Sequence, residues 1–237
     1  MHILAIHGSP SMKRGKTYLL LERLLKGAGK AGAITEVVFL QEKRISECAG
    51  CFTCWIKTPG TCAQKDDMAE LIEKLKRTDL MILATPVYVD GMTGQCKHFL
   101  DRLLPLLDPH YEIRDRHFRH VVMEKFCGRI FLVSVCAFHE MDNFDPLILH
   151  VKRVAKNFKM EYVGEILRPA VYCLDMKKVG IDAIRSVMEA IEKAGKELVE
   201  NGIVSEKTRQ EAARKIVSRQ VYLRALNRYF DTQIGLS

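Results

Sequence analysis

The sequence predicts an α/β fold in which a doubly wound, five-stranded parallel sheet is followed by an added C-terminal helix. Short apolar or β-branched runs alternate with segments whose apolar residues recur at helical spacing, the pattern that parallel strands and their helical crossovers produce. No repeat, low-complexity tract or linker divides the 237 residues, a length that suits one large domain with an extension. We therefore expect residues 1–202 to form the α/β domain and residues 203–237 a helical extension.

The elements follow one another in a regular order. Apolar or β-branched runs predict strands at 2–7, 35–40, 80–85, 129–135 and 162–167. Helical spacing predicts helices at 16–31, 66–77, 93–107, 146–158 and 179–200. The segment 108–126 carries neither pattern and is expected to be irregular. In such sheets ligands bind beyond the carboxyl ends of the strands, where the strand order reverses, so the loops after Ile6, Ala84 and Val133 are the expected binding loops.

The composition is that of an ordinary globular protein, and we expect a cytoplasmic one. The first ten residues hold a short apolar run broken by Gly8 and Pro10, without a charged leader, so secretion is not expected. No stretch approaches the length of a membrane span, and no membrane association is expected. A cytoplasmic location keeps cysteines reduced, which favours metal binding over disulfides.

The formal net charge of +8 is concentrated near the C-terminus, where basic residues outnumber acidic ones between 206 and 228. Such a segment can bind nucleic acid. However, Ile216, Leu223 and Phe230 recur every seven residues, which is typical of an amphipathic helix with one apolar stripe. We therefore expect a docking or oligomerisation helix and no nucleic-acid partner.

Four of the eight cysteines lie close together within the segment 46–64, in the pattern C-x2-C-x2-C-x7-C: Cys48, Cys51, Cys54 and Cys62. Two intervening residues let neighbouring thiolates reach one inorganic centre from a single loop. Three cysteines joined by two consecutive steps of this kind favour an iron-sulfur cluster, whereas zinc sites more often use two separated C-x2-C pairs. Zinc, redox thiols and a disulfide pair are the alternatives.

The loop after the first strand has the composition of a phosphate site. It runs from Gly8 to Thr17 directly before a helix, and backbone N–H groups at a helix N-terminus attract anions. Its candidate ligands are hydroxyl and basic side chains: Ser9, Ser11, Lys16 and Thr17. A nucleoside-triphosphate loop would need a glycine where Pro10 stands, so a terminal monophosphate such as that of FMN suits the loop better. A capped turn without a ligand is the alternative.

The loop after the third strand is a candidate surface for a flat heterocycle. Pro86, Val87, Tyr88 and Val89 follow an apolar run, and a Pro-x-Tyr turn offers backbone amides and an aromatic edge. Thr93 is expected to cap the helix that follows. A plain strand-to-helix turn is the alternative.

Three motifs, in this order, resemble the iron-sulfur flavoprotein branch of the NAD(P)H-dependent FMN reductase family: GSPSMKRGKT, the cysteine pattern followed by Asp66-Asp67-Met68, and TPVYVDGMTGQCKHFLDR. The resemblance covers about the first 105 residues. It implies a flavodoxin-like sheet that carries FMN. The phosphate would be held by Ser9, Ser11, Lys16 and Thr17, and the isoalloxazine ring would lie against Pro86, Val87, Tyr88 and Val89.

The resemblance also implies a four-iron four-sulfur (4Fe-4S) cluster on the four cysteines. Members of this branch look like electron carriers between NAD(P)H or ferredoxin-type donors and small-molecule acceptors. They look like homodimers or homotetramers in which one subunit's cluster approaches a neighbour's flavin, and no side chain is expected to be catalytic. The x7 step is long for the family, so Pro59-Gly60 must fold it back. The loop 134–140 lacks the glycines that relatives often have there.

Two other functions remain open. One is an NAD(P)H-dependent FMN or quinone reductase whose cysteines hold zinc or no metal. The other is a non-catalytic redox sensor or scaffold that binds a partner through the basic C-terminal helix. The four remaining cysteines lie in or near predicted strands and helices and are expected to be core thiols: Cys96, Cys127, Cys136 and Cys173.

Overall fold

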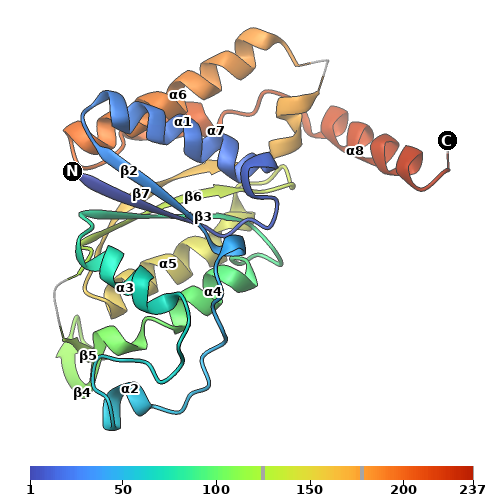
Figure 1. The fold of residues 1–237 in the computed structure, drawn as a ribbon. Coiled ribbons are helices and arrows are strands. Elements are labelled where there is room, and N and C mark those ends of the chain that lie inside the picture. The colour runs from blue at the N-terminus through green and yellow to red at the C-terminus, as the bar shows by residue number, and fades with distance from the viewer. Residues whose placement is uncertain (124–125, 177–178, 237) are drawn as a thin grey trace.

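The structure, a computed structural model, describes residues 1–123, 126–176 and 179–236. Its centre is a five-stranded parallel sheet in the spatial order β2-β1-β3-β6-β7 (Figure 1). The strands are β1 (His2–His7), β2 (Ile34–Phe39), β3 (Leu80–Pro86), β6 (Arg129–Val135) and β7 (Glu161–Arg168). All five predicted strands are confirmed, each end to within one residue.

Helices cover both faces of the sheet, as the doubly wound fold requires. One face carries α1 (Lys16–Lys30) and α6 (Ile181–Glu200), and the other carries α3 (Met68–Lys76), α4 (Gly94–Asp101) and α5 (Asp145–Asn157) (Figure 1). Successive side chains of a strand point to opposite faces, so the strands contribute to two separate apolar cores. Strand β3 lies in the middle and is buried at every residue, which explains its uninterrupted apolar sequence.

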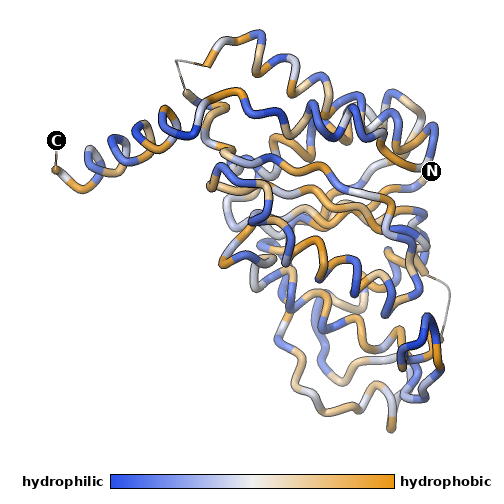
Figure 2. Tube along the Cα trace, turned by 180° about the vertical axis from the view of Figure 1, so that it is seen from behind, coloured by the Kyte–Doolittle hydropathy of each residue, from blue (hydrophilic) through white to orange (hydrophobic). Residues whose placement is uncertain are grey.

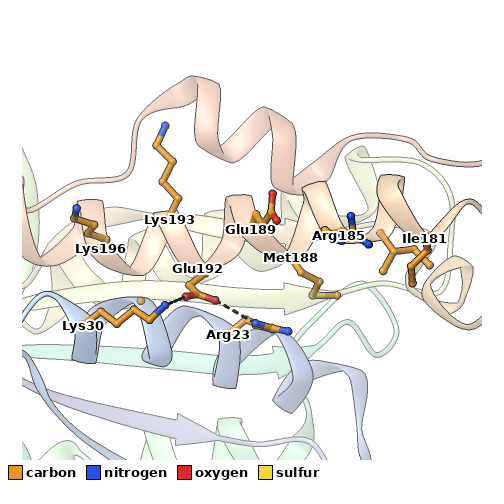
Figure 3. A pocket seen from close by; sticks show the side chains of 11 residues that line it. Arg23, Lys30, Ile181, Arg185, Met188, Glu189, Glu192, Lys193 and Lys196 are labelled. Carbon is orange, nitrogen blue, oxygen red and sulfur yellow. Dashed lines mark hydrogen bonds and ion pairs between the residues drawn. The ribbon is translucent and has the colours of Figure 1, made fainter.

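Two glycines bring α1 and α6 into close contact. A Cβ at Gly27 would lie 1.8 Å from the carbonyl oxygen of Glu192, and a Cβ at Gly195 would lie 1.8 Å from the carbonyl oxygen of Leu24. The side chain of Glu192 then accepts hydrogen bonds across the two helices from Arg23 at 3.1 Å and from Lys30 at 2.5 Å (Figure 3). The helix pair therefore depends on these two positions having no side chain.

The prediction that residues 108–126 are irregular is wrong. The segment forms an antiparallel hairpin of β4 (Leu107–Arg114) and β5 (His117–Val122), a sheet separate from the first. Residues 124 and 125 lie outside the described residues. Asp115 and Arg116 at the turn both have positive φ angles, 52° and 64°, as a type I′ turn requires. Because neither residue is Gly or Asn, the usual sequence signal for this turn is absent.

The predicted helix 93–107 is shorter than expected. Helix α4 ends at Asp101, and a 3-10 turn follows at Leu104–Leu106. Pro105 explains the difference, because its ring removes a backbone N–H and disfavours helical geometry at the residue before it.

The C-terminal extension is helical, but the predicted apolar stripe of Ile216, Leu223 and Phe230 does not lie on a single helix. Helix α7 (Glu206–Ala213) packs on α6 and β7, and α8 (Arg219–Gln233) begins after a break. Arg168 of β7 is buried and donates to the carbonyl oxygens of Ala212 at 3.2 Å and Arg214 at 2.7 Å. These bonds satisfy the end of α7 and replace the next helical turn.

Helix α8 extends away from the body of the molecule (Figures 1 and 2). Ile216 lies in the break and packs on buried residues. Leu223 and Phe230 lie on α8, each with 56 % of its surface exposed. In Figure 2 the helix carries hydrophilic and hydrophobic residues side by side. Of the predicted stripe, two residues are therefore left without a covering element among the described residues.

Within the described ranges, no helix is both long and apolar enough to cross a membrane.

Candidate functional site

The loop after β1 forms a cradle around Gly15, just before α1. Ser9 and Thr17 are buried and Ser11 is exposed. No side chain caps α1, so the amide N–H groups of its first turn are open to an anion. A Cβ at Gly15 would lie 3.0 Å from Ser11 Cβ and 3.2 Å from Ser9 Oγ. Gly15 therefore lies directly beside both serine side chains. This cradle fits a phosphate group.

Lys16 lies at the same helix start but already has a partner in the chain. Its Nζ contacts Asp175 Oδ1 at 2.5 Å. A cavity of about 480 Å³ beside the cradle is lined by Lys16 together with Lys13 and Arg14. The positive charge predicted for this loop is therefore present, and a phosphate at Lys16 would share that ammonium group with Asp175.

The hydroxyl groups of Thr93, predicted only as a helix cap, and of Thr85, not predicted at all, join the first loop to the second. The Thr93 hydroxyl donates to the Gly8 carbonyl at 2.8 Å, and the Thr93 N–H donates to Thr85 Oγ1 at 3.2 Å. The same hydroxyl accepts the N–H of Cys96 at 3.4 Å, which confirms Thr93 as the cap of α4. A Cβ at Gly8 would lie 2.0 Å from Cys96 Sγ. A hydroxyl residue at the end of the apolar run LMILAT was the available signal for Thr85.

The second predicted binding loop divides into a buried and an exposed half. Pro86 ends β3 and is buried, and the half-buried Val87 donates its N–H to the Val135 carbonyl at 2.9 Å. Tyr88 and Val89 are exposed, Tyr88 over 51 % of its surface and Val89 fully. Because β1 and β3 are neighbours in the sheet, this loop and the phosphate cradle lie at the same edge.

The exposed half is a tight turn. Tyr88 and Gly91 exchange backbone hydrogen bonds at 2.9 and 3.0 Å, and the residues between them, Val89 and Asp90, have φ angles of 48° and 55°. A β-branched residue in this left-handed region is strained, and such strain tends to occur at functional sites. The turn holds Tyr88 and Val89 out from the sheet edge with a fixed backbone.

His7 ends β1 next to the phosphate cradle. It is completely buried, and neither ring nitrogen has a hydrogen-bond partner. Its ring contacts those of Tyr18 and Phe39, with centroids 5.9 and 5.1 Å away. Burial lowers the pKa of His7 to about 4. The ring is therefore neutral at physiological pH and packs as an aromatic residue.

The loop after β6 is held by the C-terminal extension. A ring nitrogen of His139 lies 3.0 Å from the Val217 carbonyl, and the Tyr222 hydroxyl donates to the Ala137 carbonyl at 2.7 Å. Phe138 is exposed over 62 % of its surface. The His139 ring and the Ala137 carbonyl of this loop are thus already bonded to the C-terminal extension.

The four clustered cysteines lie on one loop beneath α4, around α2 (Thr53–Ile56), at the lower end of the molecule in Figure 1. Cys48 and Cys51 are exposed, Cys62 is half-buried and Cys54 is buried. Burial raises the pKa of Cys54, and the neighbouring Cys62, Cys48 and Cys51 raise it further, so each of these three thiols lies within electrostatic reach of Cys54. Among the described residues, however, no three potential ligands are arranged to hold a metal ion.

The backbone of this loop reverses where the cysteine pattern needs it to. Gly50 and Phe52, between the first three cysteines, have φ angles of 62° and 51°. Gly60, with φ 81°, donates its N–H to the Cys54 carbonyl at 3.1 Å. The expected return of the longer step at Pro59-Gly60 is confirmed. The Thr53 hydroxyl and N–H lower the pKa of Cys51, which favours the thiolate form that binds metals. The donor set thus fits a thiolate-bound centre.

Arg102 ties both ends of the cysteine loop to α4, and the sequence analysis missed it. Its guanidinium group donates to Asp66 at 2.6 and 3.0 Å, to the Ser46 carbonyl at 2.8 Å and to Cys62 Sγ at 3.5 Å. The side chains of Arg102 and Asp66 are 1 % and 3 % exposed. The only signal was the position of both residues inside motifs that the resemblance rested on. The four other cysteines are all buried and are confirmed as core thiols.

Comparison with curated proteins finds iron-sulfur flavoproteins. One from Archaeoglobus fulgidus is 36 % identical over 122 residues, which are 52 % of this chain and 58 % of the relative. A second from the same organism is 42 % identical over 105 residues, 44 % of this chain and 46 % of the relative. One from Methanocaldococcus jannaschii is 38 % identical over 106 residues, 45 % of this chain and 53 % of the relative. The matches thus span about half the length of these relatives.

Solved structures share the fold at low sequence identity. An NAD(P)H:quinone oxidoreductase from Methanothermobacter marburgensis matches with a TM-score of 0.61 at 16 % identity, over 84 % of this chain and 96 % of the other. An FMN-dependent NADH-azoreductase from Bacillus anthracis, solved with FMN, matches with a TM-score of 0.61 at 9 % identity, over 84 % and 99 %. These likenesses confirm the flavodoxin-like fold.

The family model described as NADPH-dependent FMN reductase matches residues 1–135, more than half of the chain. This span includes both predicted binding loops and all four clustered cysteines. The chain therefore belongs to the NADPH-dependent FMN reductase family.

Proposed function

We propose that this protein is an FMN-dependent oxidoreductase that passes electrons between FMN and a 4Fe-4S cluster. The observation that carries the proposal is the presence, in one chain, of a phosphate cradle around Gly15 and a loop on which three further cysteine thiols lie within electrostatic reach of Cys54. NAD(P)H or a ferredoxin-type protein is the proposed electron donor, and a small molecule is the proposed acceptor.

Two sets of residues would hold FMN. Hydroxyls, one ammonium group and the open amides of α1 bind the phosphate, from Ser9, Ser11, Lys16 and Thr17. The turn from Pro86 to Val89 supports the ring through its fixed backbone and the exposed side chains of Tyr88 and Val89. Bound FMN supplies hydride and single-electron chemistry. No side chain is proposed to act as acid, base or nucleophile.

The cysteines Cys48, Cys51, Cys54 and Cys62 would hold the cluster, which supplies single-electron transfer when bound. Arg102 keeps the two ends of their loop together and donates an N–H to Cys62 Sγ. Hydrogen bonds to cluster sulfurs and nearby charge tune the potential of such centres. Arg102 therefore acts as a positioning residue for the cysteines.

Helix α4 separates the two proposed sites within one chain. Its cap, Thr93, bonds to the phosphate loop, and Arg102, directly after its last turn, bonds to the cysteine loop. Eight helical residues rise about 12 Å. We propose that a homodimer or homotetramer brings one subunit's cysteines to another's flavin, and that α8, with exposed Leu223 and Phe230, contributes to this assembly. We further propose a reducing, cytoplasmic environment, because all eight cysteines are free thiols.

The test is a count of iron, acid-labile sulfide and flavin per chain in anaerobically purified protein. The proposal expects about four irons and one FMN per chain. Zinc with flavin would indicate instead a reductase without a cluster, and absence of both iron and flavin would favour a non-catalytic sensor or scaffold. The variant Cys51→Ser should lose iron and keep FMN. The matched variant Cys136→Ser, at a core thiol, should keep both.

A further inference from the structure

The β4–β5 hairpin covers a cavity of about 490 Å³ that the proposed function has not used. Its floor is formed by α4 and α5, and Cys48 belongs to its wall. Small-molecule sites in proteins occupy about 300–1,000 Å³, so the volume suits a ligand of two or three rings. The hairpin is held over the floor by Arg114, whose guanidinium group donates to the Asn157 carbonyl at 3.3 Å.

The walls of the cavity are apolar and aromatic. Leu100, Leu107 and Phe158 are buried side chains that line the floor. Tyr111 and Phe118 belong to the hairpin side of the lining and are exposed over 68 % and 74 % of their surface. Exposed aromatic rings beside a cavity offer contact area to a flat ligand.

One positive charge in the cavity has no acidic partner. Lys97 is bonded to Asp101 at 2.6 and 2.7 Å. Burial lowers the pKa of His150, and the nearby Lys97 lowers it further, so this ring stays neutral. Within the part of the chain that the structure describes, Arg119 makes no ion pair, and its guanidinium group donates only to the neighbouring Phe118 carbonyl at 3.3 Å. A bound anion could therefore pair with Arg119 without displacing an ion-pair partner.

Another cavity, of about 730 Å³ between α1 and α6, lacks this property (Figure 3). It is rich in basic side chains, but each is bonded to a carboxylate. Arg23 and Lys30 bond to Glu192, Arg185 to Asp182, Lys193 to Glu197 and Lys196 to Glu200. An anion there would have to displace an existing partner, so its basic lining does not predict a ligand.

We propose that the cavity under the hairpin binds a small, planar, anionic aromatic molecule. The ring system would lie between the apolar floor and the hairpin, with its acidic group on Arg119. This inference names the class of molecule that would act as electron acceptor, and it rests on the proposed function. With Cys48 as a cluster ligand, the cavity is the place where such a molecule, for example a quinone bearing an acidic group, meets the cluster.

Binding is tested with 9,10-anthraquinone-2-sulfonate on anaerobic protein whose iron and FMN have been counted. Calorimetry should give saturable binding of one molecule per chain. The uncharged 2-(hydroxymethyl)anthraquinone should bind about tenfold more weakly, since a charge-assisted contact is lost. Arg119→Gln should remove this preference, and Arg119→Lys should restore part of it. Arg116→Gln, at the hairpin turn outside the cavity, should leave it unchanged.

A second readout locates the probe. Trp55 is the single tryptophan, and its ring lies 4.7 Å from that of His120, which lines the cavity. Its emission should change with the sulfonate and change less in Arg119→Gln. No binding of the sulfonate, equal binding of both probes, or unchanged binding in Arg119→Gln would each overturn the inference. The iron count separates the two claims, because iron-free protein that binds the sulfonate refutes the proposed function and supports the binding site.

Discussion

Arg102 and Asp66 form a two-pronged ion pair at 2.6 and 3.0 Å that is almost completely removed from solvent. Burial opposes ionisation of Asp66, but hydrogen bonds from Arg102 and from the N–H groups of Ser46 and Met68 outweigh it and lower its pKa. The pair joins the residue after α4 to the segment that follows the cysteine loop, and Arg102 reaches Cys62 as well.

Arg102→Met should therefore destabilise the protein and the cysteine loop together. Removing one partner of a buried pair leaves an unpaired charge, at a cost of about 3 kcal/mol. Iron content should fall while FMN binding remains, because the flavin loops do not contact Arg102. Urea unfolding and metal counts measure both effects. As a control, Lys97→Met breaks an exposed pair with Asp101 and should cost less than about 1 kcal/mol. Equal losses of stability and iron in both variants would contradict the claim that Arg102 holds the cysteine loop.

Gly15→Ala should weaken FMN binding without affecting the fold. The backbone at Gly15 has φ −86° and ψ 156°, which any residue adopts. The added Cβ, however, would intrude between Ser9 and Ser11. We expect FMN affinity to fall about tenfold or more, a loss of about 1.4 kcal/mol, measured by quenching of flavin fluorescence. Riboflavin, which lacks the phosphate, should bind the variant and the parent equally. A similar loss for riboflavin would place the phosphate elsewhere.

Gly27→Ala should destabilise the α1–α6 contact. Its Cβ would overlap a backbone oxygen of α6, and relief of that overlap by moving the helices should cost about 3 kcal/mol. Gly29→Ala on the same helix meets no atom within 4 Å and should stabilise the protein by about 0.5–1 kcal/mol. The midpoints of urea unfolding should therefore move in opposite directions. Movement in the same direction would show that the two helices do not pack this closely.

His7→Phe should remove a pH dependence of stability. The folded-state pKa of about 4 lies below the ordinary value of 6.5, so between these values the unfolded chain binds a proton that the folded chain does not. The free energy of unfolding therefore falls as the pH falls from 6.5 toward 4, by up to about 3 kcal/mol. Phe cannot bind this proton and preserves the contacts with Tyr18 and Phe39. Urea unfolding at pH 5 and pH 8 should show a gain for the variant mainly at pH 5.

The sheet could be predicted from sequence because each strand is a short, mostly apolar or β-branched run between helical patterns. The hairpin at 107–122 could not, because its turn residues, Asp115 and Arg116, are not those that mark type I′ turns, and its strands carry exposed aromatic and basic residues on both faces. The break in the C-terminal extension was hidden for another reason. Arg168, on a strand far away in sequence, supplies the bonds that end α7.

The candidate site shows the same division. The local motifs predicted the two binding loops and the cysteine loop, because their residues are contiguous in sequence. The contacts between the loops could not be predicted, since they join Gly8 to Thr93 and Cys62 to Arg102. The spacing of residues within a motif does not show which side chain, distant in sequence, forms a hydrogen bond with that motif.

The bonds from Arg168 to the end of α7 also have a practical consequence for protein engineering. Because this guanidinium belongs to the sheet, and because Tyr222 in the first turn of α8 bonds to Ala137, the path of the chain is fixed as far as the start of α8. A reporter or a tether spliced in after Gln233, at the exposed end of α8, should leave these contacts intact, which makes it a suitable junction for immobilising the molecule on an electrode.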